Sequence, residues 1–449
     1  MNISGEFWYN EKCYPFTMSG RVVTIVGRAF QYADDFREVG DEEEIRGITS
    51  ENREIVFLHC HFIQSSFGCT SYFTVQGYAV SCNNNGESCD FSYEKSSFCS
   101  GAIDTFFSPQ KAVKINVDYA HWDGTMDIHV TPFRDTDLSF AFLNAKCQLT
   151  IARYGRLVED ITSVGKVNSI FEFEYSKPQG IQKIATDYLA LYDFLSFANY
   201  NTNIVFSDIY ISKRGKRGTY ERTATVHIFT NKTADEQSRI DSITIDDIPK
   251  DKFEAVFSRI ALLRGKDSRL RYYFPNNKHE AQYIDPGKWL ITALNFEGLF
   301  STVFPHFKCQ KNPDFNNAKR LILERIDDES DGKCLNGKAV EYYQKCREQV
   351  KHYEGQLEEK FNHVFGVHRE ALRNILTYNE TNLGVQSSQN FGSIYAAYRN
   401  KVAHGSVEPL TNKEVAVYRL LLPLIYFLLL TDTGLNEHEL SHIVCKLFN

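Results

Sequence analysis

Residues 391–405 read FGSIYAAYRNKVAHG and lie just upstream of the most apolar segment of the chain. Apolar side chains recur in this stretch at offsets 0, 3, 4, 7 and 11, namely at Phe391, Ile394, Tyr395, Tyr398 and Val402. This spacing is typical of the buried face of an amphipathic α-helix. Gly405 is of the residue type that most often ends a helix. The stretch therefore predicts a helix whose last turn carries His404.

Three polar residues, Arg399, Asn400 and His404, lie close together on this predicted helix. At 3.6 residues per turn, Asn400 and His404 share a face, and we expect Arg399, one step round, to lean back toward them. A histidine can move a proton to or from a ribose hydroxyl, and a guanidinium can bind a phosphate oxygen. The group is therefore suited to chemistry on a phosphodiester, with Arg399 and His404 both expected to be exposed.

The spacing of this arginine and histidine has little weight alone. An arginine followed by a histidine, with four or five residues between them, occurs at Arg53–His59, Arg222–His227, Arg347–His352 and Arg399–His404. Arg222 and His227 lie in a strand-like run, where an offset of five predicts opposite faces. The last pair differs because an asparagine follows the arginine, a glycine follows the histidine and a long apolar helix begins soon after. Its alternative interpretation is an exposed helix end with a cationic cap.

Residues 399–404, RNKVAH, resemble the signature of the HEPN superfamily, helical domains that are commonly metal-independent endoribonucleases. Residues 5–8, GEFW, resemble the start of the amino-terminal domain of ApeA-like proteins, which are HEPN effectors of anti-phage abortive infection. The resemblance implies that Arg399 and His404 are catalytic, that Asn400 assists, and that two protomers pair at one groove. It also implies an RNA substrate, with transfer RNA the leading candidate, no metal or other cofactor, and an amino-terminal region that responds to a phage-derived trigger.

Composition sets wider limits on the class of protein. A length of 449 residues suggests two or three domains, and a net charge of −7 argues against coating nucleic acid without regard to sequence. The cysteines form no CxxC pair, and no apolar run is long enough to cross a bilayer, so we expect a cytoplasmic protein with free thiols. A metallo-hydrolase built on His59, His61 and nearby cysteines is a less favoured alternative, because their spacing fits no standard zinc site.

The predicted fold is α+β and multidomain. Residues 1–280 form a β-rich and α+β regulatory or sensor region with a sub-boundary near 165–180, and residues 281–449 form an all-α, HEPN-like nuclease domain. Alternating apolar residues predict one strand over 56–62 and others near 126–130 and 171–175. We expect an antiparallel sandwich or barrel with more than one sheet.

The densest basic cluster is KRGKRG at 213–218, in the turn between two strand-like runs. Its four cations are Lys213, Arg214, Lys216 and Arg217. An exposed, solubilising hairpin is the favoured interpretation, and contact with an RNA backbone, shared with Lys401, is the alternative. A second basic stretch, residues 264–271, precedes three aromatic residues, a combination that suits single-stranded RNA.

The carboxyl-terminal half predicts helices. One runs from Trp289 to a point near Pro305, with Glu297 on or near its apolar face, where it points toward a cation or lies on the helix flank. A polar linker is expected over 311–334 and one long helix over 340–364. Residues 411–414 have the form of a capping box. The helix over 420–430 is apolar nearly all round, so it is buried in a bundle or between subunits and supports a homodimer.

A second class of function competes with the nuclease. A helical scaffold that has lost its chemistry would act by association, with the amino-terminal region as the working part. The overall acidity and the lack of a strong basic stripe favour this class, whereas the intact Arg399 and His404 weigh against it.

Overall fold

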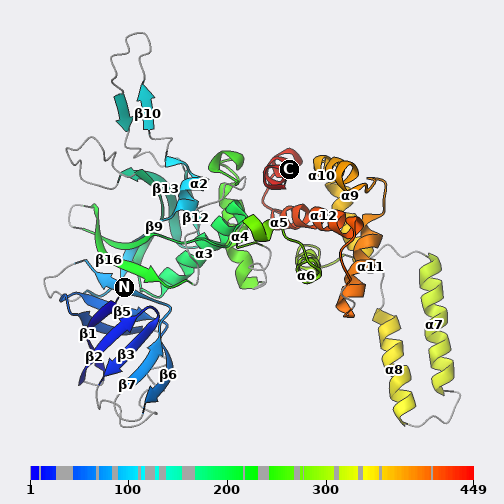
Figure 1. Cartoon of the computed structure of the whole chain (residues 1–449), viewed down its shortest axis with the longest axis horizontal. Coiled ribbons are helices and arrows are strands. Elements are labelled where there is room, and N and C mark those ends of the chain that lie inside the picture. The colour runs from blue at the N-terminus through cyan, green and yellow to red at the C-terminus, as the bar shows by residue number, and fades with distance from the viewer. Residues whose placement is uncertain are drawn as a thin grey trace. The chain divides into compact units, whose positions relative to one another are not determined.

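A computed structural model gives the fold. It describes residues 2–9, 12–26, 44–66, 70–82, 89–109, 113–116, 127–130, 138–153, 167–215, 218–230, 242–266, 274–276, 278–307, 313–331, 337–352, 356–405 and 408–448. The chain divides into two compact units, Met1–Lys278 and His279–Asn449. The first is built on a large antiparallel sheet and the second almost entirely from helices (Figure 1). The expected mixed α+β, multidomain architecture is therefore confirmed.

In the described part of the first unit, fourteen strands pair into one antiparallel sheet, in the order β12-β13-β14-β9-β15-β16-β8-β5-β4-β1-β2-β3-β7-β6. Their bounds are β1 Asn2–Tyr9, β2 Lys12–Ser19, β3 Val22–Val26, β4 Glu44–Thr49, β5 Glu54–Leu58, β6 His61–Ser66, β7 Thr70–Thr74, β8 Gly77–Ser81, β9 Tyr93–Cys99, β12 Leu138–Phe142, β13 Ala145–Arg153, β14 Val167–Gln179, β15 Asp208–Arg214 and β16 Tyr220–Ile228. A separate ribbon joins β10 (Val113–Asn116) and β11 (Asp127–Val130).

Strand β14 spans residues 167–179, the region in which a sub-boundary was expected, and pairs with β13 on one side and β9 on the other. One expectation about this sheet was wrong. Residues 56–62 are not one strand, because β5 ends at Leu58 and β6 begins at His61. His59 between them has φ = 50°, in the left-handed region that breaks an extended run. Residues 55–58 are all buried, so β5 is covered on both faces.

Helices α2 (Gly101–Phe106), α3 (Lys183–Asn199) and α4 (Phe253–Lys266) belong to the same unit. The expected helix near 184–195 is therefore confirmed as α3, which packs on α2 and α4. A phenylalanine cluster joins α3 and α4 to the sheet: Phe140, Phe142, Phe171, Phe173, Phe194, Phe253 and Phe257. All are buried, and such aromatic pairs contribute beyond the area they bury.

A buried carboxylate, Asp187 on α3, lies within this unit and is only 2% exposed. Tyr175 Oη donates to its Oδ1 at 2.5 Å, and Ser96 Oγ and Tyr93 Oη donate to its Oδ2 at 2.8 and 3.1 Å. Lys183 Nζ lies 3.8 Å from Oδ1. Burial raises the pKa of Asp187, although these hydrogen bonds oppose the effect. The folded protein therefore binds a proton at Asp187 more tightly than the unfolded chain does.

This linkage gives a prediction for stability against pH. Because the folded pKa of Asp187 is raised, its contribution to the free energy of unfolding is complete below the unfolded pKa, near 3.8, and is lost as pH rises through the folded pKa. We expect urea titrations at pH 4 to 7 to show that the free energy of unfolding of the wild type, relative to that of Asp187→Asn, falls as pH rises. A flat difference for Asp187→Asn would contradict the linkage.

The second unit has a helical core made by α6 (Pro286–Val303), α9 (Gln356–Val367), α11 (Phe391–Ala403) and α12 (Asn412–Leu429), with α13 (Glu437–Phe448) packed on α12. Short elements are α5 (Lys278–Gln282), α10 (Arg373–Tyr378) and the π-helical turn η4 (Asn379–Leu383). Trp289, Phe296, Phe361 and Tyr395 meet at the centre of the core with ring contacts of 5.2–6.1 Å. The predicted helix near 289–300 and the capping box of Thr411 with Glu414 are confirmed.

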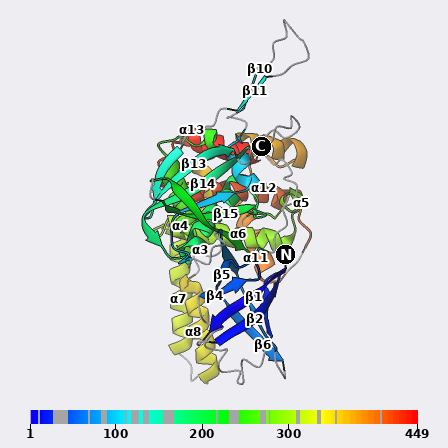
Figure 2. The same cartoon turned by 90° about the vertical axis from the view of Figure 1, so that its left-hand side faces the viewer.

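The expected linker over 311–334 was wrong. It contains helix α7 (Pro313–Asp331), which lies side by side with α8 (Gly337–His352) in both views (Figures 1 and 2). Arg347 of α8 donates from Nε to Asp327 Oδ1 of α7 at 2.6 Å. The single long helix expected over 340–364 is described as two helices, α8 and α9, with residues 353–355 outside the described part of the chain.

Helix α12 is buried within one chain. Its apolar residues from Leu420 to Leu429 are buried except for Leu422, which is half-buried, and it packs on α6, α11 and α13. Of the two alternatives predicted from the sequence, burial in a bundle or between subunits, the first is therefore found, because the chain's own helices bury α12. A homodimer now depends on the chemistry of the site alone.

Candidate active site

Helix α11 carries the motif that the sequence analysis singled out. Its N-cap is Asn390, whose side chain accepts a hydrogen bond from the Ser393 amide at 3.2 Å. Four members of the predicted apolar stripe are buried, namely Phe391, Tyr395, Tyr398 and Val402. The helix ends with His404 as the C-cap and Gly405 at φ = 85°, the left-handed conformation that glycine adopts at little cost. The predicted helix and its end are confirmed.

Arg399 is bound to Glu297 of α6 by two hydrogen bonds. Its Nε donates to Oε1 at 2.8 Å and its Nη2 donates to Oε2 at 3.0 Å, the bidentate geometry that fits a guanidinium to a carboxylate. The side chains are only 23% and 17% exposed, so solvent screens this pair less than a surface pair. The hydrogen bonds to Glu297 raise the pKa of the Arg399 guanidinium above its ordinary value. Glu297 therefore points toward a cation, as one interpretation of the sequence predicted.

Tyr395 is the third member of this polar group, and the sequence analysis counted it only as part of the apolar stripe. Its Oη lies 3.2 Å from Glu297 Oε1 and 3.3 Å from the carbonyl oxygen of Ala293. Burial and the nearby Glu297 carboxylate raise the pKa of Tyr395, so its hydroxyl stays protonated and can donate. A buried tyrosine usually needs a partner for its hydroxyl, and this was the signal that the sequence offered.

One expectation about Arg399 was wrong. The side chain does not lean back toward Asn400 and His404 as an exposed group; it is partly buried and turned to α6. The reason is energetic, because a carboxylate within reach in a poorly solvated place binds a guanidinium more tightly than water does. Asn400 and His404 are both exposed on α11. The His404 amide donates to the Asn400 carbonyl at 3.1 Å, which closes the last turn.

Lys401, a candidate RNA contact, is exposed but ion-paired with Glu408, a residue just beyond the helix. Tyr398 Oη donates to the carbonyl oxygen of the same Glu408 at 3.2 Å. The segment that follows the motif is thus tied back to α11 at two points. The positive charge of Lys401 is offset locally, which weakens the case for an RNA contact there.

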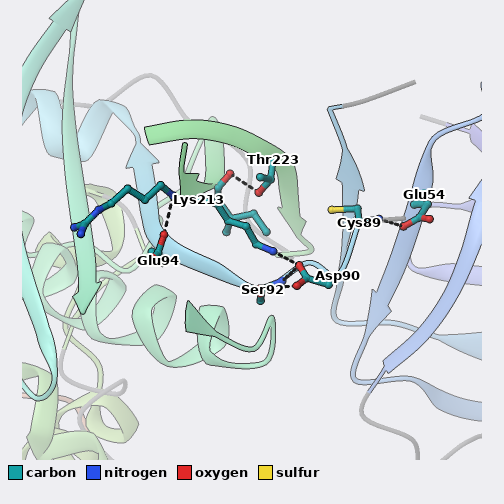
Figure 3. Close-up of polar contacts among 9 residues, drawn as sticks. Glu54, Cys89, Asp90, Ser92, Glu94, Lys213 and Thr223 are labelled. Atoms are coloured by element: carbon teal, nitrogen blue, oxygen red, sulfur yellow. Dashed lines mark hydrogen bonds and ion pairs between the residues drawn. The ribbon is translucent and has the colours of Figure 1, made fainter. Parts of the chain in front are cut away.

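Two cations of the predicted basic hairpin also have acidic partners. Lys213 is ion-paired with Asp90, and Ser92 donates to the same carboxylate at 3.0 Å (Figure 3). Arg214 Nη2 lies 3.3 Å from Glu174 Oε1, and its amide donates to Glu94 at 2.7 Å. Lys216 and Arg217 lie outside the described residues. The hairpin of β15 and β16 is confirmed, and its described cations are engaged within the protein.

Other sequence candidates have limited support. No group of three or more His, Cys, Asp or Glu side chains suited to a metal ion occurs within the described ranges, and Cys60, Cys82, Cys89 and Cys99 form no disulfide there. Residues 267–273 of the second basic stretch lie outside the described chain, while Phe274 beside it is buried. No helix in the described part of the chain is long and apolar enough to span a membrane.

Comparison with known proteins finds no match: neither a protein-family model, nor a curated protein, nor a solved structure is similar to this chain.

Proposed function

We propose that this chain is a metal-independent endoribonuclease of the HEPN type that acts in anti-phage defence, with Arg399, Asn400 and His404 as its site. The observation that carries the proposal is the exposed imidazole of His404 at the end of α11, one turn from the exposed amide of Asn400. An exposed histidine beside a hydrogen-bonding amide can reach a substrate hydroxyl, and histidine is the side chain best suited to proton transfer near neutral pH.

The proposed reaction is transfer of the phosphate to the neighbouring ribose hydroxyl. His404 removes the proton from a 2′-hydroxyl, the 2′-oxygen attacks the adjacent phosphorus, and the bond to the 5′-oxygen breaks. The leaving 5′-oxygen takes up a proton, giving a 2′,3′-cyclic phosphate and a 5′-hydroxyl. Asn400 positions the phosphate by hydrogen bonding, and Arg399 stabilises the charge that develops on it.

Arg399 can serve in this reaction only with part of its guanidinium. Nε and Nη2 are bound to Glu297, and Nη1 makes no hydrogen bond to any residue within the described ranges. Because Glu297 fixes the plane of the guanidinium, Nη1 is held in one orientation, which suits a group that must meet a developing charge. Two proton transfers are needed and each chain supplies one motif histidine, so the proposal includes a homodimer through the helical unit.

A catalytically inactive scaffold is the second candidate, and one observation favours it. The bidentate pair with Glu297 neutralises Arg399, and Lys401 is paired with Glu408. A site whose cations are already engaged attracts a phosphate backbone less strongly. If the protein is such a scaffold, α11 is a structural helix and the protein acts by binding a partner.

An assay on RNA separates the two candidates. The pure protein is incubated with total RNA and with transfer RNA in excess EDTA, with and without an extract of phage-infected cells that would supply the proposed trigger. We expect discrete cuts that persist in EDTA and leave 2′,3′-cyclic phosphate ends, because the imidazole and guanidinium supply the proton transfer and charge stabilisation.

Protein that cleaves RNA should sediment as a dimer in analytical ultracentrifugation. A fully active monomer would contradict the pairing of two motifs, and cleavage abolished by EDTA would contradict the metal-independent reaction. Absence of cleavage under all these conditions would favour the scaffold.

A further inference from the structure

A β-bulge in β16 changes which residues share a face of the large sheet. Ile211 of β15 pairs with Ala224, but the next residue, Ser212, pairs with Arg222, so Thr223 is the extra residue. Thr223 Oγ1 donates to the Ile211 carbonyl at 3.2 Å. An extra residue shifts the alternation of side chains by one position. Arg222 and His227 therefore lie on the same face, and the sequence expectation that they lie on opposite faces was wrong.

Both side chains line a cavity of about 360 Å³ in the first unit. The cavity lies across β16, β8 and β1 and reaches the turn between β4 and β5, from which Arg53 contributes. Hydroxyl groups of Ser4, Ser50 and Thr225 also line it. Strands far apart in the sequence thus bring two guanidinium groups, an imidazole and several hydroxyls to one place.

The Arg222 guanidinium is held in a fixed position. Its central carbon lies 3.5 Å from the centre of the Tyr210 ring, and Nη2 donates to Thr225 Oγ1 at 2.5 Å. No ion pair of Arg222 occurs among the residues that the structure describes. A guanidinium stacked on an aromatic ring keeps its edge available for an anion.

Arg53 is the second cation, and its charge is only weakly compensated. Its ion pair with Glu51, at 3.5 Å from Nη2, is to a side chain that is 72% exposed, so solvent screens the pair strongly. Glu51 also lines the cavity. Arg53 Nε is buried and makes no hydrogen bond to the described residues. A buried donor without a partner is costly.

His227 and Tyr78 contribute a stacked pair of rings, the His227–Tyr78 wall, to the lining of the cavity. Their rings are stacked with centroids 4.7 Å apart and planes 22° from parallel. Burial lowers the pKa of His227, Asp208 opposes this and Arg222 adds to it, so the imidazole favours its neutral form. A neutral flat ring is a surface on which another planar ring can stack.

We propose that this cavity binds a small organic phosphate, with Arg222 and Arg53 on the phosphate and the His227–Tyr78 wall beside the organic part. Two guanidinium groups with hydroxyl donors match the oxygens of a phosphate. The volume lies at the lower end of the range for small-molecule sites and exceeds what a phosphate ion alone needs. Nucleoside monophosphates combine a phosphate with a planar ring and are the probes of choice.

Isothermal titration calorimetry of the full chain in phosphate-free buffer tests the site. The titrants are AMP, CMP, GMP and UMP, the corresponding nucleosides and inorganic phosphate. We expect saturable binding of at least one monophosphate, with its nucleoside and inorganic phosphate each bound at least about 10-fold more weakly. Arg222→Ala and Arg53→Ala should each weaken that binding by about 10- to 100-fold, as expected for loss of charge-assisted hydrogen bonds.

Arg214→Ala is the matched control, because it removes a cation from the same β15–β16 hairpin that does not line the cavity. Its affinity should equal that of the wild type. Far-UV circular dichroism checks each variant, and Arg53→Ala, at the strand turn, decides the outcome if Arg222→Ala does not fold. Absence of binding by all four monophosphates overturns the proposal. Unchanged affinity in folded Arg222→Ala and Arg53→Ala proteins, or inorganic phosphate binding as tightly as the monophosphates, overturns it equally.

Discussion

The His404→Ala protein should unfold at the same urea concentration as the wild type and cleave RNA about 100- to 10,000-fold more slowly, the range expected for loss of a general acid or base. His404 is exposed and contributes only its backbone to the end of α11, where its amide donates to Asn400. Alanine keeps that amide, so the helix end should be preserved. Initial rates on the RNA cut by the wild type, measured alongside urea denaturation, check both halves of the prediction.

A matched control separates the loss of the imidazole from the loss of a surface histidine in general. His438 of α13 is likewise exposed in the helical unit but lies outside the motif. His438→Ala should cleave at the wild-type rate. If highly purified His404→Ala cleaved RNA at that rate too, the proposed role of His404 as proton carrier would be wrong. The protein preparations would then have to be tested for a contaminating nuclease.

The helical motif could be predicted from the sequence because its determinants are local. The period of apolar residues and a glycine at the left-handed position specify α11 and its end, and both depend on neighbours within a few residues. The same holds for the capping box of Thr411 and Glu414. In each case one short stretch contains both partners of the interaction.

The partner of Arg399 could be anticipated only in part. Glu297 lies 102 residues away, and its position near an apolar face suggested a cation without identifying which one. The sequence therefore predicted an exposed Arg399 and did not reveal that its guanidinium is bound to Glu297 of α6. Likewise, the apolar surface of α12 indicated that the helix is buried but could not show that α6, α11 and α13 bury it.

Small backbone irregularities account for the errors in the sheet. A residue with positive φ at His59 splits one alternating run into two strands, and one extra residue at Thr223 moves Arg222 to the face of His227. Neither side chain favours these conformations strongly, so tertiary pairing decides them. Helix α7 was missed for a different reason, because its acidic carboxyl-terminal half is typical of a solvated loop.

The pair of Arg399 with Glu297 gives the second large effect. Arg399→Ala should abolish detectable cleavage and also lower the free energy of unfolding by about 1–3 kcal/mol, because a partly buried carboxylate is left without its cation. This differs from the exposed arginine first expected, whose loss would leave stability unchanged. Urea denaturation of Arg399→Ala, Glu297→Ala and the double variant measures the coupling between the two side chains, which we expect to be about 1–3 kcal/mol.

Arg347 and Asp327, paired at 2.6 Å between α8 and α7, provide the control for stability. Their side chains are 43% and 44% exposed, so solvent screens the pair and Arg347→Ala should lower the free energy of unfolding less than Arg399→Ala does. A loss for Arg399→Ala no larger than this would show that burial does not strengthen the Glu297 pair.

Cleavage by Glu297→Gln then decides what the pair does. Glutamine keeps the size of the side chain and can still accept one hydrogen bond, but it no longer holds both Nε and Nη2 of Arg399 through a carboxylate. If Glu297 positions Arg399 for the reaction, the glutamine variant should retain affinity for RNA but cleave about 10-fold or more slowly, as expected for loss of orientation. Faster cleavage would instead mean that Glu297 withholds the guanidinium from the phosphate, so that the bidentate pair restrains the enzyme and its release is a step toward activity.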